Sequence, residues 1–257
     1  MTEPSVRYEP ISPLDEPQSL DDIVVASDAI LGTWNQLVEA LGSDRVKSVV
    51  EAETWRSAVE TGLLEHLYAF GDALTEAIVQ YGLAAEEARA LEDSTYSQIA
   101  AHRHAHDVMV QAIHDGRPLS VSLVKELHAA VTGAQSSYQA HDQFGRPVLC
   151  ALNRGQFKRS DNHVRLASDL HFYAPWLQVD SEMDRLIGFL EQYDSYPPVV
   201  VASYVHHRFT AIHPFEDGNG RVARLLGDYY LIRSGLLPLV IGRRHRAAYL
   251  DALHVAD

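Results

Sequence analysis

Residues 213–224, His-Pro-Phe-Glu-Asp-Gly-Asn-Gly-Arg-Val-Ala-Arg, are the stretch of the sequence that constrains the fold most strongly. Pro214 disfavours helical geometry at the residue before it, so a helix must end at His213. Gly218 and Gly220 let the backbone turn several N–H groups toward one point, as in an anion-binding nest. A helix that begins there adds the positive end of its dipole. The stretch therefore predicts a helix, a corner and a second helix that together can bind an anion.

The polar side chains of this stretch indicate which anion it binds. Arg221 and Arg224 are three residues apart on the second helix, so both project toward the same volume, where guanidinium groups can form forked contacts with phosphate. Asp217 suits Mg²⁺, which proteins commonly hold with one or two carboxylates together with substrate phosphates. Asn219 can reach a phosphate oxygen with its amide. His213 can serve as a general base, because imidazole exchanges protons near neutral pH. Phosphoryl or nucleotidyl transfer from a Mg-nucleotide is the predicted chemistry, without a Walker loop, since no lysine follows the glycines.

The remainder of the chain predicts an all-α fold. Apolar residues recur at helical spacing and stop at glycines, which predicts helices over 23–41, 52–81, 83–114, 120–131, 181–193, 198–212, 220–233 and from 244 to the end. Residues 134–177 differ, because they combine glycines and prolines with short apolar alternations. They predict a long excursion from the helical core that carries a small β-hairpin.

Three regions follow from this pattern. Residues 1–20 hold four of the 11 prolines and predict an extended leader. Residues 21–115 form an N-terminal helical region, and residues 116–257 form the catalytic core. The helical pattern still continues at Asp257, which suggests a core truncated at its C-terminus.

Composition excludes several classes of partner. A net charge of −14 opposes binding to nucleic acid or to an anionic membrane. Residues 208–246, however, contain seven arginines and only three acidic residues. This local excess of positive charge suits a small anion. Cys150 is the only cysteine, so there is no internal disulfide. The sequence shows neither a membrane-length apolar run nor a secretion signal, and we expect a cytoplasmic protein.

The stretch 213–224 resembles, position by position, the signature HPFx[DE]GNGRxxR of the Fic-domain family. Residues 120–128 resemble the family helix before its flap. Residues 154–159, Arg-Gly-Gln-Phe-Lys-Arg, resemble its G-x-[FY]-R stretch, although Lys158 stands where arginine is commoner. Phe172 and Tyr173 resemble the edge of the β-hairpin flap that positions the target segment. The resemblance extends over roughly residues 52 to 250, and it implies a helical Fic core with a small flap.

The resemblance implies adenylylation (AMPylation), the transfer of AMP from ATP to a Ser, Thr or Tyr hydroxyl of a target protein, with release of pyrophosphate. His213 would deprotonate the hydroxyl, and Asp217 would hold Mg²⁺. The anion hole and the outer phosphate contacts would come from Gly218, Asn219, Gly220, Arg221 and Arg224. ATP and a hydroxyl-bearing protein are the expected partners, and homo-oligomerisation stays open.

Many family members also carry an inhibitory helix with the motif [ST]xxxE[GN], whose glutamate pairs with the second motif arginine. Residues 61–66, Thr-Gly-Leu-Leu-Glu-His, resemble this motif except at His66. Thr61 and Glu65 are therefore the predicted inhibitory residues, with Arg224 as the partner. A rival frame that begins at Ser97 lacks the acid.

Other activities stay open at this point. The same signature is compatible with transfer of UMP, phosphate or phosphocholine, with removal of AMP, or with a module that only senses ATP. His102, His104 and His106 suggest a metal site, but no spacing completes a ligand set, so we expect none there.

Overall fold

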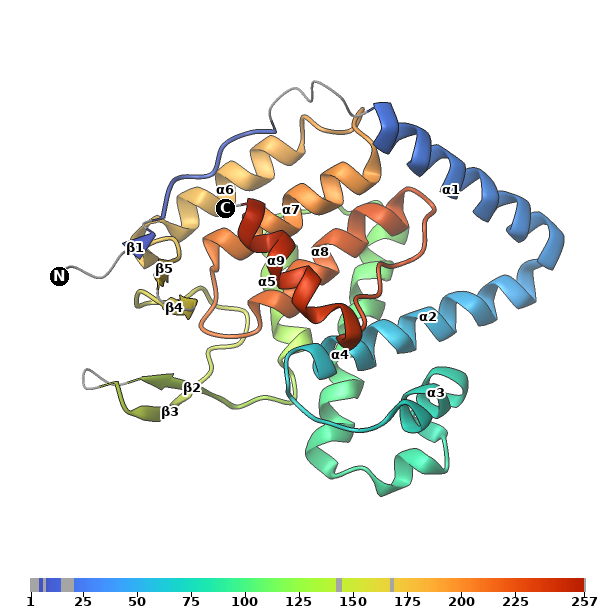
Figure 1. Cartoon of the computed structure of the whole chain (residues 1–257), viewed down its shortest axis with the longest axis horizontal. Helices are drawn as coiled ribbons and strands as arrows, with labels where there is room; N and C mark the ends of the chain where they lie inside the picture. The colour runs from blue at the N-terminus through green and yellow to red at the C-terminus, as the bar shows by residue number, and fades with distance from the viewer. Residues whose placement is uncertain (1–4, 7, 15–20, 142–144, 167–168, 257) are drawn as a thin grey trace.

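The computed structural model describes residues 5–6, 8–14, 21–141, 145–166 and 169–256. Within these residues the chain is predominantly helical, which confirms the all-α prediction (Figure 1). The α-helices are α1 Asp21–Leu41, α2 Ser43–Leu64, α3 Asp72–Tyr81, α4 Asp93–His114, α5 Val121–Val131, α6 Val179–Leu190, α7 Pro198–Ile212, α8 Asn219–Arg233 and α9 Arg246–Ala256. None of these helices is both long and apolar enough to cross a membrane.

Helices α7 and α8 form the centre of the molecule, and α4, α5 and α6 pack around them (Figure 1). Phe209 of α7 and Leu226 of α8 are fully buried in the main hydrophobic core, and Phe215 in the corner between the two helices joins them there. The segment 213–224 is thus held on both sides by well-packed helices. This packing gives the corner a fixed position in the fold.

Two of the predicted helices are wrong in their extent. The pattern over 52–81 is two helices, because α2 ends at Leu64 and α3 begins only at Asp72. Residues 82–92 contain two short 3₁₀ turns, Gly82–Ala84 and Glu87–Ala90, so α4 begins at Asp93 rather than at residue 83. The apolar stripe of 52–81 still meets in one satellite core around Val59, Leu63 and Tyr68. The apolar spacing thus correctly predicted that these residues are buried together. It did not predict the sharp turn of the chain at His66, where φ is +56°.

The excursion 134–177 carries two antiparallel hairpins rather than one. Strands β2 (Ser137–His141) and β3 (Pro147–Ala151) form the first hairpin. Strands β4 (His163–Leu166) and β5 (Asp169–Phe172) form the second, and β1 (Ser5–Val6) adds to β5 in parallel (Figure 1). The second hairpin ends beside the corner between α7 and α8, as described below.

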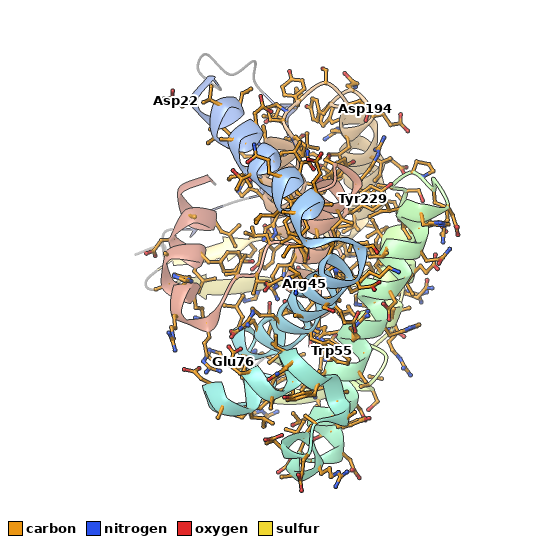
Figure 2. All side chains as sticks on the ribbon, turned by 90° about the vertical axis from the view of Figure 1, so that its right-hand side faces the viewer. Asp22, Arg45, Trp55, Glu76, Asp194 and Tyr229 are labelled. Atoms are coloured by element: carbon orange, nitrogen blue, oxygen red, sulfur yellow. The ribbon has the colours of Figure 1, made fainter. Side chains whose placement is uncertain are left out.

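The described part of the predicted leader lies against the core. Residues 8–14 have no regular secondary structure, and Ile11 among them is buried. Helix α1 lies farther out and packs mainly on α2; Asp22 and Arg45 mark the first turns of α1 and α2 in Figure 2. The N-terminal segment therefore reaches the helical core before α1 begins.

Candidate active site

The corner between α7 and α8 has the backbone geometry that Pro214 and the glycines predict. His213 is the C-cap residue of α7 and adopts a left-handed conformation, with φ of +50°. Gly218 caps the start of α8 with a backbone φ of +81°, a value that residues other than glycine rarely adopt. A Cβ atom on Gly218 would lie 2.9 Å from the methyl group of Thr132, so no larger residue fits. Asn219, the first residue of α8, lies beside His213, with its Nδ2 3.1 Å from Nδ1 of the imidazole.

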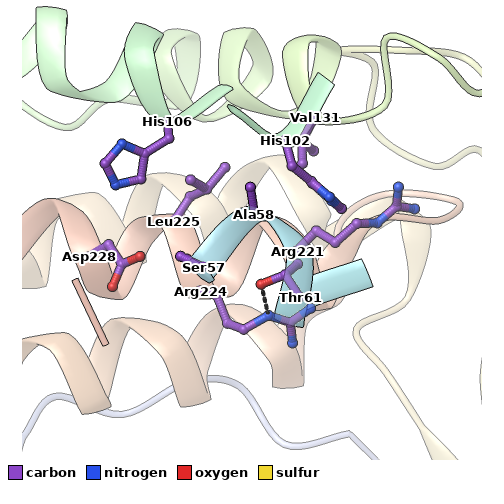
Figure 3. Close-up of a pocket in the computed structure, with 10 residues that line it drawn as sticks. All are labelled: Ser57, Ala58, Thr61, His102, His106, Val131, Arg221, Arg224, Leu225 and Asp228. Carbon is purple, nitrogen blue, oxygen red and sulfur yellow. Dashed lines mark hydrogen bonds between the residues drawn. The ribbon is translucent and has the colours of Figure 1, made fainter. Parts of the chain in front are cut away.

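Both motif arginines are buried and lie at this end of α8. Arg221 is 3% exposed and donates to Gln135 Oε1 at 2.9 Å, and it approaches Asp217 Oδ1 at 3.4 Å. Arg224 is 6% exposed and lies beside α2, with its Nε 3.2 Å from Thr61 Oγ1 (Figure 3). Two guanidinium groups at a helix N-terminus give this volume the charge that attracts an anion.

Glu65 occupies part of that volume. Its Oε1 is 2.5 Å from Nη2 of Arg224, with the carboxylate side chain 35% exposed and the guanidinium side chain 5% exposed. The same oxygen lies so close above α8 that a Cβ atom on Gly220 would be only 2.4 Å from it. Burial opposes the charge of Arg224, yet Glu65 and Tyr249 outweigh this effect, and the pKa of Arg224 is raised. The predicted pair of Glu65 and Arg224 is thus formed, and Thr61 contacts the same guanidinium.

Asp217 lies at the rim of the site and is already hydrogen-bonded. Its Oδ2 accepts from Gln135 Nε2 at 2.5 Å, and its Oδ1 accepts from the N–H of Gly218 at 2.6 Å. Its side chain is 39% exposed, so a lone pair of Oδ2 can still face a cation. Among the described residues no group of three metal-ligating side chains comes together. The donor set therefore fits a cation that shares one carboxylate with substrate phosphates and waters, and not an all-protein metal site.

Asn162, Asn219 and Tyr173 are among the residues that hold His213. Its Nδ1 lies 2.9 Å from Nδ2 of Asn162 and 3.1 Å from Nδ2 of Asn219. Tyr173 stacks on the imidazole face, with ring centroids 3.9 Å apart and an interplanar angle of 9°. Tyr173 directly follows β5. This predicted flap residue therefore contacts His213, the predicted base, through the stacking of the two rings. Phe172, the last residue of β5, contacts the His163 ring instead.

The side chain of Asn219 has a different position from the one predicted. Asn219 is 2% exposed; its Oδ1 accepts from the N–H of Phe215, and its Nδ2 donates to the Phe215 carbonyl. These bonds turn the amide into the corner and away from the anion volume. The contribution of Asn219 to a phosphate site would come from its backbone at the start of α8.

Four further residues build the site, and sequence reasoning did not assign them a role. His128 of α5 is fully buried; its Nδ1 accepts from Gly155 and its Nε2 is 3.0 Å from the Asp217 carbonyl. Burial lowers the pKa of His128 to about 4. Gln135 bridges Arg221 and Asp217. The remaining two are Lys158 and Asn162, which the chain brings to His213 from the loop before β4. The resemblance of residues 154–159 was the available signal for Lys158.

A small cavity of about 20 Å³ lies behind the arginines, between α2, α4 and α8 (Figure 3). His102 and His106 of α4 and Asp228 of α8 line it, each at most 4% exposed. Burial lowers the pKa of His106 to about 4 and raises that of Asp228 to about 7. His104 is exposed, and the histidines of α4 form no metal-ligating group with other described residues. Ser97, which begins the rival frame of the inhibitory motif, also lies on α4. The frame that begins at Thr61 is the one that contacts Arg224.

Comparison with known proteins gives a consistent result. Residues 118–231 match the model of the Fic/DOC family. "Protein adenylyltransferase Fic" of Culex quinquefasciatus is 43% identical over 77 residues, 29% of this chain and 15% of that protein. "Protein adenylyltransferase fic-1" of Caenorhabditis elegans is 30% identical over 159 residues, 62% of this chain and 28% of that protein. The chain thus spans well under a third of the length of these relatives.

Solved structures share the fold. A Fic domain containing signaling protein from Bacteroides thetaiotaomicron VPI-5482 superposes with a TM-score of 0.73 at 24% identity, over 89% of this chain and 80% of that one. Fic-1 from C. elegans (residues 134–508) gives a TM-score of 0.63 at 20% identity, over 91% of this chain and 66% of that one. The arrangement of helices around the corner is therefore common to these proteins.

Proposed function

We propose that the protein, whose residues 118–231 match the Fic/DOC family model, transfers AMP from ATP to a hydroxyl group of a target protein. The observation that carries the proposal is the convergence of His213 and two buried arginines on the N-terminus of α8. An imidazole beside an anion site can take a proton while phosphate charge is stabilised next to it. The names of the adenylyltransferase relatives support AMP as the transferred group.

The chemistry divides among the residues as follows. The target Ser, Thr or Tyr oxygen attacks the α-phosphorus of ATP, and its proton passes to His213. The bond between the α-phosphorus and the oxygen that bridges to the β-phosphate breaks, and pyrophosphate leaves. The N–H groups at Gly218, Asn219 and Gly220 stabilise the phosphate oxygens, and Arg221 and Arg224 hold the outer phosphates. Tyr173, stacked on His213, keeps the ring in place at the edge where the target segment would lie.

Asp217 is the residue that would hold Mg²⁺. The charge of the ion, when it is bound, neutralises part of the phosphate charge. Gln135 supports the arrangement from the protein side, because it donates to Asp217 and accepts from Arg221. An Asp217→Asn variant should therefore weaken ATP binding in the presence of Mg²⁺ more than in its absence.

We further propose that Glu65 inhibits the transfer from within the chain. Its carboxylate takes the guanidinium of Arg224 and the space above Gly220, which are the positions that a terminal phosphate would need. Two anions cannot share that volume, so ATP and the docked Glu65 compete. Release of Glu65 should raise transfer activity, because a free Arg224 can then bind the outer phosphates in a productive arrangement.

The test uses ATP labelled at the α-phosphate, Mg²⁺ and a cell extract as the source of target proteins. Glu65→Gly should label protein at least about tenfold more than wild type, since a lost charged contact to a buried guanidinium corresponds to roughly 1.5–3 kcal/mol. Adding His213→Ala to Glu65→Gly should abolish labelling. His66→Gly is the matched control, because it places a glycine in the same turn but keeps the carboxylate.

Parallel reactions identify the donor. ATP labelled at the γ-phosphate should give no more label with Glu65→Gly than with Glu65→Gly and His213→Ala, where only the kinases of the extract act. UTP labelled at the α-phosphate should label protein much less than ATP does. Label from γ-labelled ATP that depends on His213 would instead establish phosphate transfer. Equal labelling by wild type and Glu65→Gly would contradict inhibition by Glu65 while leaving AMP transfer standing.

A further inference from the structure

Lys158 is a buried cation with an unusual partner. Lys158 is 3% exposed, and its Nζ lies 2.5 Å from Oδ1 of Asn162. Its backbone N–H donates to the Pro214 carbonyl, which fixes Lys158 next to the corner. Burial lowers the pKa of Lys158 to about 8, and only the nearby Asp161 opposes that shift. A buried ammonium bonded to a neutral amide is costly, which suggests a role beyond packing.

The ammonium fixes the orientation of the Asn162 amide. An ammonium group has only donors, so the amide must turn its oxygen toward Lys158. The Nδ2 group of Asn162 then faces His213 Nδ1 at 2.9 Å. The Asn219 amide is oriented independently, because its oxygen accepts from the Phe215 N–H, and it too directs Nδ2 at His213 Nδ1.

Two N–H donors directed at one ring nitrogen determine which nitrogen carries the proton. Nδ1 of His213 must accept, so the single proton of the neutral ring lies on Nε2. A base that takes a hydroxyl proton at Nε2 needs the opposite tautomer, with a lone pair on Nε2 and the proton on Nδ1. The amides therefore oppose the tautomer that proton transfer at Nε2 requires.

We propose that Asn162, oriented by Lys158, is a positioning residue that holds His213 in the Nε2–H tautomer and thereby restrains transfer independently of Glu65. This inference rests on the proposed role of His213 as the base. Reversal of the Asn162 amide would relieve the restraint, and the Lys158 ammonium opposes that reversal because it would then face an NH₂ group. A carboxylate in place of the amide would accept from Nδ1–H and from Lys158 together.

The test measures the tautomer directly by ¹⁵N NMR of the imidazole nitrogens in the protein without nucleotide. Wild type should show His213 protonated on Nε2, and Asn162→Asp should show it protonated on Nδ1. Lys158→Arg should retain the wild-type tautomer, since guanidinium also has only donors, whereas Lys158→Met should give a mixture. Gln139→Glu, an added charge on exposed strand β2, is the matched control and should change nothing at His213. A wild-type ring protonated on Nδ1, or no change in Asn162→Asp, would overturn the proposal.

Kinetics in the Glu65→Gly background supply the second readout. Asn162→Asp should raise kcat by about tenfold, which is less than the roughly 10²–10⁴-fold that a positioned base contributes in full, and leave KM for ATP within about twofold. An unchanged kcat despite the switched tautomer would also overturn the restraint. If no variant transfers AMP, the proposed function fails, and the NMR result still decides the tautomer.

Discussion

His66 is the one residue of the segment 61–66 that departs from the motif [ST]xxxE[GN], and its backbone conformation explains why the motif has glycine or asparagine there. Helix α2 ends in a Schellman turn, in which the N–H of Leu67 bonds to the Gly62 carbonyl and the N–H of His66 bonds to the Leu63 carbonyl. The residue at position 66 must be left-handed, which glycine and asparagine adopt most readily. The inhibitory motif therefore has a structural reason for [GN] after its glutamate, and His66 occupies that position under strain.

Replacing His66 by glycine should consequently stabilise the protein. We expect a gain of up to about 1 kcal/mol in the free energy of unfolding, because relief of the left-handed strain exceeds the entropy that glycine adds to the unfolded chain. Urea denaturation measures it. The same substitution at the exposed His104, inside α4, should cost about 0.5–1 kcal/mol. A loss at both positions would show that the turn carries no strain.

At the scale of an element, the end of α2 depends on a close contact that a glycine permits. A Cβ atom on Gly62 would lie 2.2 Å from the Tyr68 hydroxyl oxygen, and that hydroxyl donates to the Val59 carbonyl at 3.1 Å. Tyr68 thus folds back over the last turn of the helix that carries Glu65. The turn and the Glu65 carboxylate are held by one packing arrangement.

Gly62→Ala should therefore destabilise the protein, although alanine is the better helix former. Displacement of Tyr68 should cost about 1–3 kcal/mol, as overpacking does elsewhere, and should raise basal AMP transfer because Glu65 loses its position. Gly188→Ala in α6, where a Cβ meets no atom within 4 Å, should instead stabilise the protein by about 0.5–1 kcal/mol. Thermal denaturation and the labelling assay check both variants, and a stable, inactive Gly62→Ala protein would be inconsistent with this packing.

The helices also contain neutral histidines that make the fold sensitive to acid. Burial lowers the pKa of His106 from 6.5 to about 4, and that of His206 to about 3. Below pH 6.5 the unfolded chain binds protons that the folded chain excludes, so stability is present above 6.5 and falls as the pH approaches 4. Asp228, with its pKa raised to about 7, acts in the opposite direction, because the folded state holds its proton between pH 3.8 and 7.

His106→Gln should reduce the loss of stability between pH 6.5 and 4 by on the order of 3 kcal/mol, the equivalent of the shift in the pKa of His106. Urea denaturation at both pH values gives the difference. The exposed His104→Gln should leave the acid loss at its wild-type size. Identical acid sensitivity of wild type and His106→Gln would contradict the buried neutral state of His106.

At the scale of the whole molecule, the N-terminal segment is part of the helical core. The Tyr8 hydroxyl donates to Glu182 Oε2 at 2.5 Å, and the N–H of Ile11 donates to the same oxygen at 2.9 Å. Glu182 of α6 is 2% exposed. The Tyr204 hydroxyl of α7 in turn donates to the Ser12 carbonyl. Residues 8–14 thus satisfy a buried carboxylate and join α6 to α7.

Tyr8→Phe should lower the free energy of unfolding by about 1–3 kcal/mol, since a buried carboxylate loses a donor. For a chain of this size the melting temperature should fall by roughly 2–4 °C for each kcal/mol. Tyr81→Phe, at a residue that is 61% exposed, is the control and should have no effect. A Tyr8→Phe protein as stable as wild type would mean that the segment contributes nothing to the core.

The sequence predicted the parts of the site that lie close together along the chain. Pro214 and the glycines define the corner, and the arginine spacing places both guanidinium groups at one end of α8. The missed residues reach the site through long-range packing: Asn162 lies 51 residues from His213, and Gln135 lies 82 residues from Asp217. The break at His66 was missed because the apolar spacing of two packed helices mimics that of one. Glu65 was found through its motif, and its contact with Arg224 spans 159 residues.

The most direct measurement identifies the chemical group that the protein attaches. Purified Glu65→Gly is incubated with ATP, Mg²⁺ and the cell extract that supplies target proteins, alongside Glu65→Gly with His213→Ala, and the modified proteins of both reactions are analysed by mass spectrometry. We predict a mass increase of one AMP on Ser, Thr or Tyr in the first reaction and none in the second. An adduct of another mass, or an AMP adduct that persists without His213, would contradict AMP transfer with His213 as the base.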